Sequence, residues 1–220
     1  TLPLIVEGTS MPLAQRHVEK IGSAQVKSAI LLAALNTHRI TEVEVEKKSR
    51  DHTENLLSII NADIKIKKFK KGHLISLKGK KNLTSFISKI PGDPSSSAPF
   101  VILTLLAKNS KLLIKNVNCN DTRIGFINIL KKMNANIKIK NKKKKYGETV
   151  GDILIKSSSL KSINCPKYLT PAAIDEFPLL FVAASVAKGI SKFNGIGELR
   201  HKESDRIKNM EVGLNYIGIK

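Results

Sequence analysis

The chain has 220 residues, 38 of them Lys or Arg and 18 Asp or Glu, which gives a formal net charge of +20. Its apolar fraction of 41% is too high for a disordered polycation and is enough for a buried core. No apolar run reaches the roughly 18 residues that a membrane-spanning helix needs, so we expect no membrane partner. The two cysteines, Cys119 and Cys165, lie far apart outside any CxxC pair, which predicts a reducing cytoplasmic environment and no metal site.

The basic residues are mostly Lys, since only six of the 38 are Arg. They are dense in two stretches with strand and turn patterns, KIKKFKK at residues 65–71 and KIKNKKKK at residues 138–145. Nucleic-acid recognition favours the planar fork of Arg over the point charge of Lys, and neither stretch carries an aromatic RNA-binding motif or zinc-finger spacing. We therefore interpret both stretches as solvated hairpin edges and expect no nucleic-acid partner.

The first predicted elements are two helices with a strand between them. Residues 24–35 form a short helix whose apolar residues predict burial nearly all round. The alternation of RITEVEVE at residues 39–46 predicts a strand. An amphipathic helix follows at residues 51–61, with candidate capping residues at positions 49–54. Its core candidates are Leu56, Leu57, Ile59 and Ile60.

A hairpin completes this part of the chain. Its strands are expected at residues 64–68 and 73–78, joined across the turn at residues 70–72. A further strand, at residues 4–7 or 86–90, would give the order βαβαββ. The pattern therefore predicts a small α/β unit.

The same pattern recurs further along the chain. NADIKIK at residues 61–67 reappears as NANIKIK at residues 134–140, and SAQVKSAILLAAL at residues 23–35 matches SSAPFVILTLLAK at residues 96–108. A looser third copy begins with DEFPLLFVAASVAKG at Asp175. Repeats of this length are longer than common solenoid units, so each is interpreted as an α/β unit.

Three predicted helix starts carry small polar residues, at positions 22–25, 93–97 and 174–176. The second follows IPGDPSSSAP at residues 90–99, which is typical of a hinge or domain boundary. Free amides at a helix start can bind phosphate, and ordinary N-capping is the alternative. At the third start, Asp175 is either an N-cap or a partly dehydrated carboxylate able to act as a base.

The densest polar stretch is ELRHKESDR at residues 198–206, which we interpret as a strand end leading into a helix near Ser204. Lys202 and Arg206 are like charges four positions apart, which is unfavourable in a solvated helix. Such a pair is better explained if both side chains face an anion. Glu203 beside Lys202 supplies a titratable acid.

These motifs together resemble the bacterial 5-enolpyruvylshikimate-3-phosphate synthase family, whose members are also called 3-phosphoshikimate 1-carboxyvinyltransferases. Five segments carry the resemblance in the family's order: SAQVKSAILLAAL (23–35), SRDHTE (49–54), PGDPSSSAPF (91–100), DEFPLLFVAASVAKG (175–189) and ELRHKESDRI (198–207). The resemblance implies an α/β fold of repeated βαβαββ units. It implies two domains that form an inside-out α/β barrel, incomplete in this chain.

The resemblance also implies how the chain is divided. Residues 1–88 would be the latter part of the first enolpyruvyl transferase domain, and residues 89–220 the first part of the second. The family's other substrate contacts are expected before Thr1 and after Lys220. We therefore expect an internal fragment that is inactive alone, from an enzyme that is a monomer at full length.

The activity implied is transfer of the enolpyruvyl group of phosphoenolpyruvate to the 5-hydroxyl of shikimate 3-phosphate, with release of phosphate and without a cofactor. Both substrates are anionic small molecules, so cationic side chains are expected at the site. The resemblance assigns substrate binding to Ser23, Ala24, Gln25, Arg50, Lys202 and Arg206. It assigns catalysis to Asp175, as the base for the 5-hydroxyl, and to Glu203, in proton transfer at the enolpyruvyl carbon.

Two alternatives remain open from the sequence. UDP-N-acetylglucosamine enolpyruvyl transferase shares the fold and chemistry, but it is expected to carry a reactive loop Cys and to lack KESDR. Cys119 follows a predicted strand in no matching motif. A basic RNA-binding module is the second alternative, because RNA 3'-phosphate cyclases have related repeat units. Salt-sensitive RNA binding without shikimate 3-phosphate binding would favour it.

Overall fold

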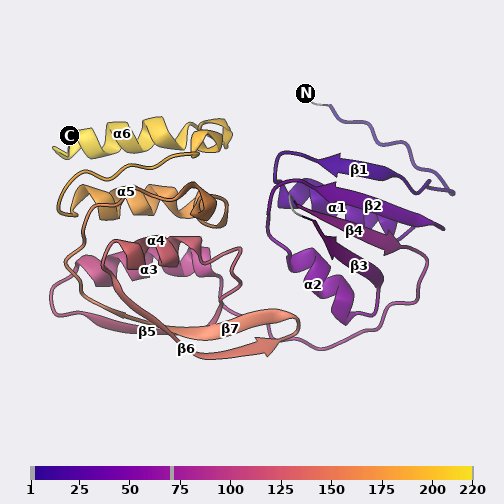
Figure 1. Ribbon diagram of the computed structural model, residues 1–220, viewed down its shortest axis with the longest axis horizontal. Coiled ribbons are helices and arrows are strands. Elements are labelled where there is room, and N and C mark those ends of the chain that lie inside the picture. The colour runs from indigo at the N-terminus through magenta and orange to yellow at the C-terminus, as the bar shows by residue number, and fades with distance from the viewer. Residues whose placement is uncertain (1–2, 70–71, 220) are drawn as a thin grey trace. The chain divides into compact units, whose positions relative to one another are not determined.

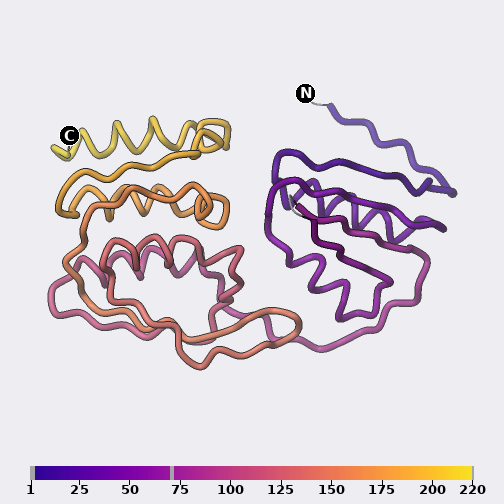
Figure 2. Tube along the Cα trace, viewed as in Figure 1, coloured from indigo at the N-terminus to yellow at the C-terminus, as the bar shows by residue number. Residues whose placement is uncertain are grey.

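The computed structural model describes residues 3–69 and 72–219. The chain divides into two compact units, Thr1–Ile87 and Ser88–Lys220, which we call the first and the second unit. Both units pack helices against a β-sheet, so the predicted α/β class is confirmed (Figure 1). The connection between them includes residues 81–91, which form neither helix nor strand (Figure 2).

The first unit has the order βαβαββ. Its elements are β1 (Arg16–Glu19), α1 (Ala24–Ala34), β2 (Ile40–Val45), α2 (His52–Ile59), β3 (Asp63–Lys68) and β4 (His73–Lys78). The four strands form one sheet in the order β1-β2-β4-β3. β1 is parallel to β2, whereas β4 is antiparallel to both β2 and β3. The sheet is therefore mixed.

The core of the first unit lies between its sheet and its two helices. β2 alternates between buried and less buried residues, as its period-two sequence predicts. α1 and α2 each contribute a fully buried Leu. The buried apolar cluster consists of Leu31, Ala34, Val43, Val45, Leu57, Ile75 and Leu77.

The second unit begins with a similar arrangement and then adds further helices. Its helices and strands are α3 (Pro94–Leu106), β5 (Lys111–Asn118), α4 (Gly125–Lys132), β6 (Asn136–Lys145), β7 (Glu148–Lys156), α5 (Phe177–Ser185) and α6 (Arg206–Tyr216). Three short 3-10 helices complete it, η1 (Lys167–Leu169), η2 (Pro171–Glu176) and η3 (Gly197–His201). The sheet is antiparallel in the order β5-β7-β6. α3 and α4 cover this sheet, and α5 and α6 follow as further layers (Figure 1).

The predicted internal repeat is present in the structure. The segments α1-β2-α2-β3-β4 and α3-β5-α4-β6-β7 have the same order, and the last strand of each segment lies between the two other strands of that segment. Asn61 and Asn134 follow the second helix of each copy with positive φ values of 63° and 70°. Asn tolerates this left-handed conformation better than most residues, so NADIKIK and NANIKIK mark the same helix-to-strand turn.

Aromatic packing fixes the start of α5 in the second unit. Phe177 is fully buried, and its ring centroid lies 6.0 Å from that of Phe181 and 5.6 Å from that of Phe193. Phe181 and Phe193 are themselves 5.5 Å apart. This cluster holds the junction between η2 and α5, which carries Asp175.

No helix in the described ranges is both long and apolar enough to cross a bilayer.

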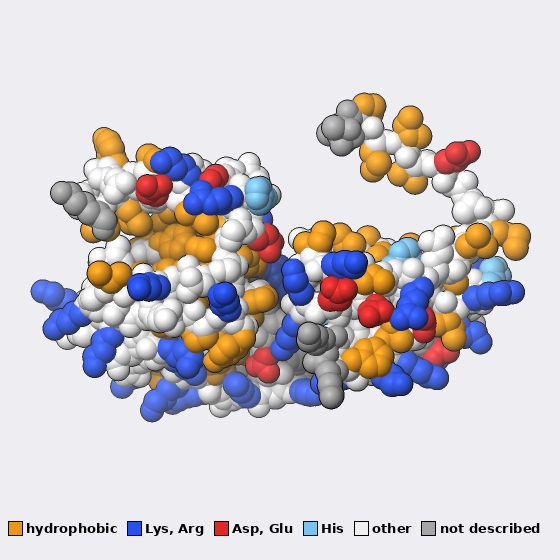
Figure 3. Space-filling model, turned by 45° about the horizontal axis from the view of Figure 1, so that its top comes forward, with side chains coloured by type: hydrophobic (Ala, Val, Ile, Leu, Met, Phe, Trp, Pro, Cys, Tyr) orange, Lys and Arg blue, Asp and Glu red, His pale blue; other side chains and the backbone are white. Residues whose placement is uncertain are grey.

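Both Lys-rich stretches belong to antiparallel hairpins, as predicted. β3 pairs with β4, and β6 pairs with β7. The predicted turn residues Lys70 and Lys71 lie outside the described residues. On the face that Figure 3 shows, Lys and Arg side chains lie over both units. This distribution agrees with solvated hairpin edges.

The predicted first strand was placed wrongly. Residues 4–7 and 86–90 form no strand, and the strand that completes βαβαββ is β1. β1 has the sequence RHVE, which is too short and too charged to show an apolar alternation. Its position depends on parallel pairing with β2, which a local pattern does not reveal.

Two burial predictions for the helices of the first unit were also wrong. α1 is not buried all round, because Val26 and Leu32 are 46% and 53% exposed. In α2, Leu57 is buried but Leu56 is 44% exposed. A charged residue, Glu54, takes an inward position on α2 and is 1% exposed. The buried position of Glu54 is explained by its ion pair with Lys27, which is also buried.

Candidate functional site

The second unit brings together four residues that the sequence singled out. Asp175 lies in η2, and Glu176 separates it from the buried start of α5 at Phe177. Lys202, Glu203 and Arg206 come from the segment between η3 and the first residue of α6. Burial of α5 and the packing of α6 against it therefore hold the two segments side by side.

Local capping sets the direction of α6. The side chain of Asp205 accepts a hydrogen bond of 2.9 Å from the amide of Lys208, which makes Asp205 the N-cap. Arg200 in turn donates to Asp205 across 2.8 Å. The cap places Arg206 in the first turn of the helix, with its guanidinium near η2.

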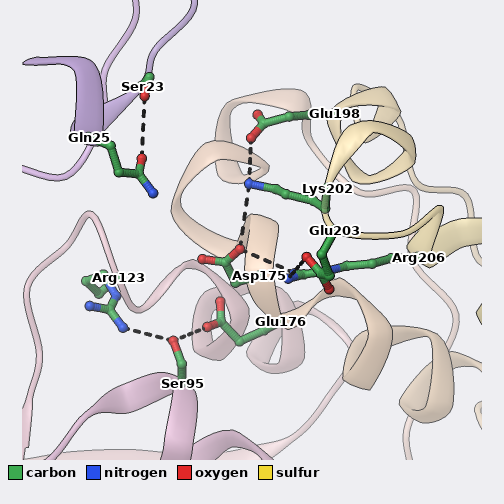
Figure 4. Close-up of polar contacts among 10 residues, drawn as sticks. All are labelled: Ser23, Gln25, Ser95, Arg123, Asp175, Glu176, Glu198, Lys202, Glu203 and Arg206. Atoms are coloured by element: carbon green, nitrogen blue, oxygen red, sulfur yellow. Dashed lines mark hydrogen bonds and ion pairs between the residues drawn. The ribbon is translucent and has the colours of Figure 1, made fainter. Parts of the chain in front are cut away.

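Two cations approach one oxygen of the Asp175 carboxylate. Lys202 Nζ lies 3.9 Å and Arg206 Nη1 lies 3.4 Å from Asp175 Oδ1 (Figure 4). Lys202 also pairs with Glu198 at 2.8 Å. The side chains of Lys202, Asp175 and Arg206 are 24–31% exposed, so a solute can reach them. The arrangement combines a carboxylate with two cations that an anionic ligand could share.

Arg206 also makes a two-pronged contact with Glu203. Arg206 Nε donates to Glu203 Oε1 at 2.9 Å, and Nη2 donates to Oε2 at 3.0 Å. This hydrogen bonding lowers the pKa of Glu203 and raises the pKa of Arg206. Glu203 is therefore a carboxylate in this state, and it occupies the part of Arg206 that an anionic substrate would use.

A second polar network supports η2 from α3. The Ser95 hydroxyl donates to the carboxylate of Glu176, which is 3% exposed and adjacent to Asp175. Arg123 donates to Ser95 Oγ at 2.9 Å and pairs with Asp93 (Figure 4). Asp93 is the N-cap of α3 and accepts from the amide of Ser96. The network joins the start of α3 to the residue next to Asp175.

In the first unit, the predicted residues 23–25 lie at the start of α1. Ser23 is the N-cap, and its hydroxyl oxygen accepts from the amide of Val26 at 3.2 Å. The Ser23 hydroxyl also donates to Gln25 Oε1 at 3.4 Å, and Ala24 is the first helical residue (Figure 4). Both Ser23 and Asp93 therefore serve as N-caps, the alternative that the sequence had left open.

The approach to α1 differs from the free helix start that the sequence suggested. The buried carboxylate of Glu19 accepts hydrogen bonds from the amides of Gly22 and Ser23, at 2.8–3.1 Å. These two amides are thus already occupied. Any phosphate contact at this point must come from side chains or from amides further into α1.

Arg50 lies just before α2 and is partly buried. Its carbonyl accepts a hydrogen bond of 2.7 Å from Lys27 of α1. Lys27 is fully buried and pairs with Glu54. The sequence analysis missed these partners, although a single Lys within an otherwise apolar helix segment was the signal that could have found them.

One local prediction in the second unit was wrong, because the segment before Lys202 is the 3-10 helix η3 and not a strand end. The helix expected near Ser204 is present as α6, with its N-cap at Asp205. Of the two alternatives for Asp175, the N-cap does not apply, because η2 runs through Asp175 and α5 begins after Glu176. Within the described ranges, no group of His, Cys, Asp and Glu side chains could hold a metal ion.

Comparison with known proteins agrees with the fold. The family model described as EPSP synthase (3-phosphoshikimate 1-carboxyvinyltransferase) matches residues 1–220. The chain therefore belongs to the EPSP synthase family.

Individual relatives agree with this assignment. A 3-phosphoshikimate 1-carboxyvinyltransferase from Bartonella tribocorum is 46% identical over 97% of this chain and 48% of the relative. One from Petrotoga mobilis is 44% identical over 99% of this chain and 50% of the relative. The solved EPSP synthase of Acinetobacter baumannii superposes with a TM-score of 0.84 and 39% identity, over 93% of this chain and 45% of that structure. The chain spans about half the length of the curated relatives that it matches.

Proposed function

We propose that the whole protein transfers the enolpyruvyl group of phosphoenolpyruvate to the 5-hydroxyl of shikimate 3-phosphate and releases phosphate. The observation that carries the proposal is the approach of Lys202 and Arg206 to Asp175, at 3.9 and 3.4 Å. A general base beside two cations suits a reaction in which an alcohol attacks an anionic substrate. Membership of the EPSP synthase family supports the same reaction.

In the proposed reaction Asp175 takes the proton of the 5-hydroxyl while that oxygen bonds to C2 of phosphoenolpyruvate. C3 of phosphoenolpyruvate gains a proton from Glu203, which gives a tetrahedral intermediate. Elimination then returns a proton from C3 to Glu203, re-forms the double bond and breaks the bond from C2 to the phosphate oxygen. The proton that Asp175 took from the 5-hydroxyl passes to the leaving phosphate, so both carboxyl groups return to their starting states and the reaction needs no cofactor.

The Glu203–Arg206 contact gives this scheme a physical condition. Hydrogen bonding from Arg206 lowers the pKa of Glu203, so Glu203 is ionised and holds no proton to donate while the contact lasts. In the proposal, phosphoenolpyruvate takes the place of Glu203 on Arg206. Release of Glu203 removes the main cause of its lowered pKa, and Glu203 then takes up a proton from water, which it donates to C3.

The remaining predicted residues bind substrate in the proposal. Lys202 binds shikimate 3-phosphate in the second unit, and Arg50 does so in the first. Ser23, Ala24 and Gln25 contribute at the start of α1, where Ser23 and Gln25 already contact each other and Gln25 also reaches phosphoenolpyruvate. Positively charged side chains suit this role because both ligands are polyanions.

We also propose that the whole protein works as a monomer in the cytoplasm without a nucleic-acid partner. On the face that Figure 3 shows, Lys and Arg side chains alternate with other residues, whereas a nucleic-acid interface gathers them in a patch or stripe.

Calorimetric titration of the full-length protein tests the main proposal. Shikimate 3-phosphate should bind alone, and phosphoenolpyruvate should then bind to the binary complex and yield phosphate. Failure of full-length protein to bind shikimate 3-phosphate would contradict the proposal. Salt-sensitive binding of RNA in its place would favour the RNA-binding alternative.

A further inference from the structure

Lys27 is a charged residue in the core of the first unit. Its side chain is 0% exposed, and its ammonium lies 2.6 Å from Glu54 Oε1, whose side chain is 1% exposed. Apart from this ion pair, neither Glu54 oxygen has a hydrogen-bond partner among the described residues. A buried ion pair is poor evidence for stability, because removing both charges from water offsets their attraction. The pair therefore calls for an explanation other than stability.

The second contact of Lys27 supplies that explanation. Its ammonium donates a hydrogen bond of 2.7 Å to the carbonyl of Arg50. Residues 47–50, which contain Arg50, form neither helix nor strand. An ammonium held in place by a buried carboxylate fixes the carbonyl of Arg50 from inside the protein.

Lys27 is also tied to the start of α1. Its amide donates to the carbonyl of Ser23 at 3.2 Å, in the first turn of the helix. A second contact between the two helices lies beside it, where the hydroxyls of Ser28 and Thr53 are 2.6 Å apart. One residue thus connects the turn that carries Ser23 with the segment that carries Arg50.

We propose that Lys27, held by Glu54, is a positioning residue that sets Arg50 relative to the start of α1 for binding a phosphorylated substrate. This inference rests on the proposed function of Ser23 and Arg50. Lys27 itself touches no substrate, because it is fully buried. An apolar pair could fill the same volume but could not donate to the carbonyl of Arg50.

The test uses the full-length protein with Lys27→Met and Glu54→Leu combined, which removes both charges and keeps the core filled. A second variant, Lys27→Gln with Glu54→Gln, keeps polar groups but has a side chain at position 27 one bond too short. This second variant replaces the first in the test if the apolar pair does not fold. Leu31→Ala is the control, because Leu31 is a fully buried residue of the same helix.

Hydrogen exchange of the ligand-free protein is the first measurement, since it does not depend on the identity of the substrate. Both pair variants should speed exchange in the peptide covering residues 48–55. Exchange in the peptide covering residues 148–156 should be unchanged. Unaltered exchange at residues 48–55 in a folded pair variant would overturn the positioning role, whatever the protein binds.

Affinity for shikimate 3-phosphate is the second measurement. The apolar pair should weaken binding about tenfold, in line with the loss of one charge-assisted hydrogen bond. Leu31→Ala should lower the thermal midpoint and leave the affinity unchanged. The same pair introduced into an Arg50→Ala background should cause no further loss, because Lys27 acts through Arg50.

The outcomes separate this inference from the proposed function. If wild-type protein does not bind shikimate 3-phosphate, the proposed function fails, and hydrogen exchange still decides whether Lys27 positions residues 48–55. If wild-type protein binds but the pair and Arg50→Ala weaken affinity independently, the proposed function stands and the role of Lys27 is overturned.

Discussion

Each unit brings opposite charges together, but at different depths. In the first unit, Lys27 and Glu54 are 0% and 1% exposed and contact each other at 2.6 Å. In the second, Lys202 and Arg206 approach Asp175 across longer distances, and all three side chains are about a quarter to a third exposed. A buried pair cannot change partners without leaving a bare charge in the core. An exposed cluster can exchange a protein carboxylate for a ligand.

The difference separates the charges of this basic chain that can contact a ligand from those that hold the protein backbone in place. Arg206 holds Glu203 with two hydrogen bonds, yet Glu203 is 67% exposed and can be displaced. Glu54 has no comparable freedom, because it lies in the core beside Lys27. Substitutions in the exposed cluster should therefore act mainly on kcat and KM. Substitutions in the buried pair should act mainly on the free energy of unfolding.

The largest effect should come from Asp175→Asn in the full-length protein. An amide cannot accept the proton of the 5-hydroxyl, so kcat should fall by about 10²–10⁴-fold. Affinity for shikimate 3-phosphate by calorimetry should change little. Glu211→Gln, which alters an exposed carboxylate of the same unit, should leave kcat unchanged. Unchanged turnover in Asp175→Asn would remove Asp175 from the mechanism.

The next effect should be on stability, from Glu54→Ala. This change leaves the buried ammonium of Lys27 without its carboxylate, which should cost about 3–5 kcal/mol of unfolding free energy. Urea denaturation followed by circular dichroism measures it. Glu211→Ala breaks the exposed pair with Lys208 and should cost less than about 0.5 kcal/mol. Equal losses of unfolding free energy in Glu54→Ala and Glu211→Ala would contradict the expected difference between a buried and an exposed ion pair.

A smaller effect is expected from Arg206→Lys. An ammonium keeps the charge but cannot make two parallel hydrogen bonds, so KM for phosphoenolpyruvate should rise by about 10–100-fold. Loss of the same contact should let the pKa of Glu203 move back towards its ordinary value, which carboxyl chemical shifts can follow. A KM equal to that of wild type would show that Arg206 does not hold phosphoenolpyruvate.

The smallest effect concerns His73 at the start of β4. Burial lowers the pKa of His73, and the charge of Lys27 lowers it further. The folded state therefore prefers neutral His73, whereas the unfolded chain takes up a proton at its ordinary pKa of about 6.5. Stability should fall as the pH drops below that value.

Urea midpoints at pH 8 and pH 5.5 measure this effect. His73→Gln should reduce the loss of stability between the two values, and His38→Gln, on an exposed residue, is the control. In the pair variant Lys27→Met with Glu54→Leu, the contribution of His73 to the loss of stability between pH 8 and pH 5.5 should change as well. A steeper loss in His73→Gln than in wild type would contradict the assigned direction.

Much of the fold was accessible from the sequence because it repeats. β2 shows a clear alternation, and the two Asn-containing turns before β3 and β6 have nearly identical sequences. β1 was not accessible, because four residues with two charges carry no periodic signal and are ordered by parallel pairing. The exposure of Leu56 was missed because Glu54 and Leu57 face inward, and a buried Glu contradicts ordinary amphipathic patterning.

The candidate site shows the same division. Lys202, Glu203 and Arg206 lie in one short stretch, and a like-charged pair at this spacing was enough to single them out. Glu198 pairs with Lys202 at a local spacing of four residues. The partner Asp175, and the support from Ser95 and Glu176, depend on contacts between segments that are distant in the chain. No local pattern pairs Ser95 with Glu176, so this network required the structure.

The hydrogen bond from Ser95 to Glu176 joins residues separated by 81 positions. Contacts of such long range close a large loop and tend to form late in folding. The strands of the repeated segment pair across shorter separations in the chain, as β5 and β6 do with β7, and can form earlier. Assembly around Asp175 therefore depends on completion of the rest of the second unit, and a growing chain acquires its repeat before it acquires the candidate base.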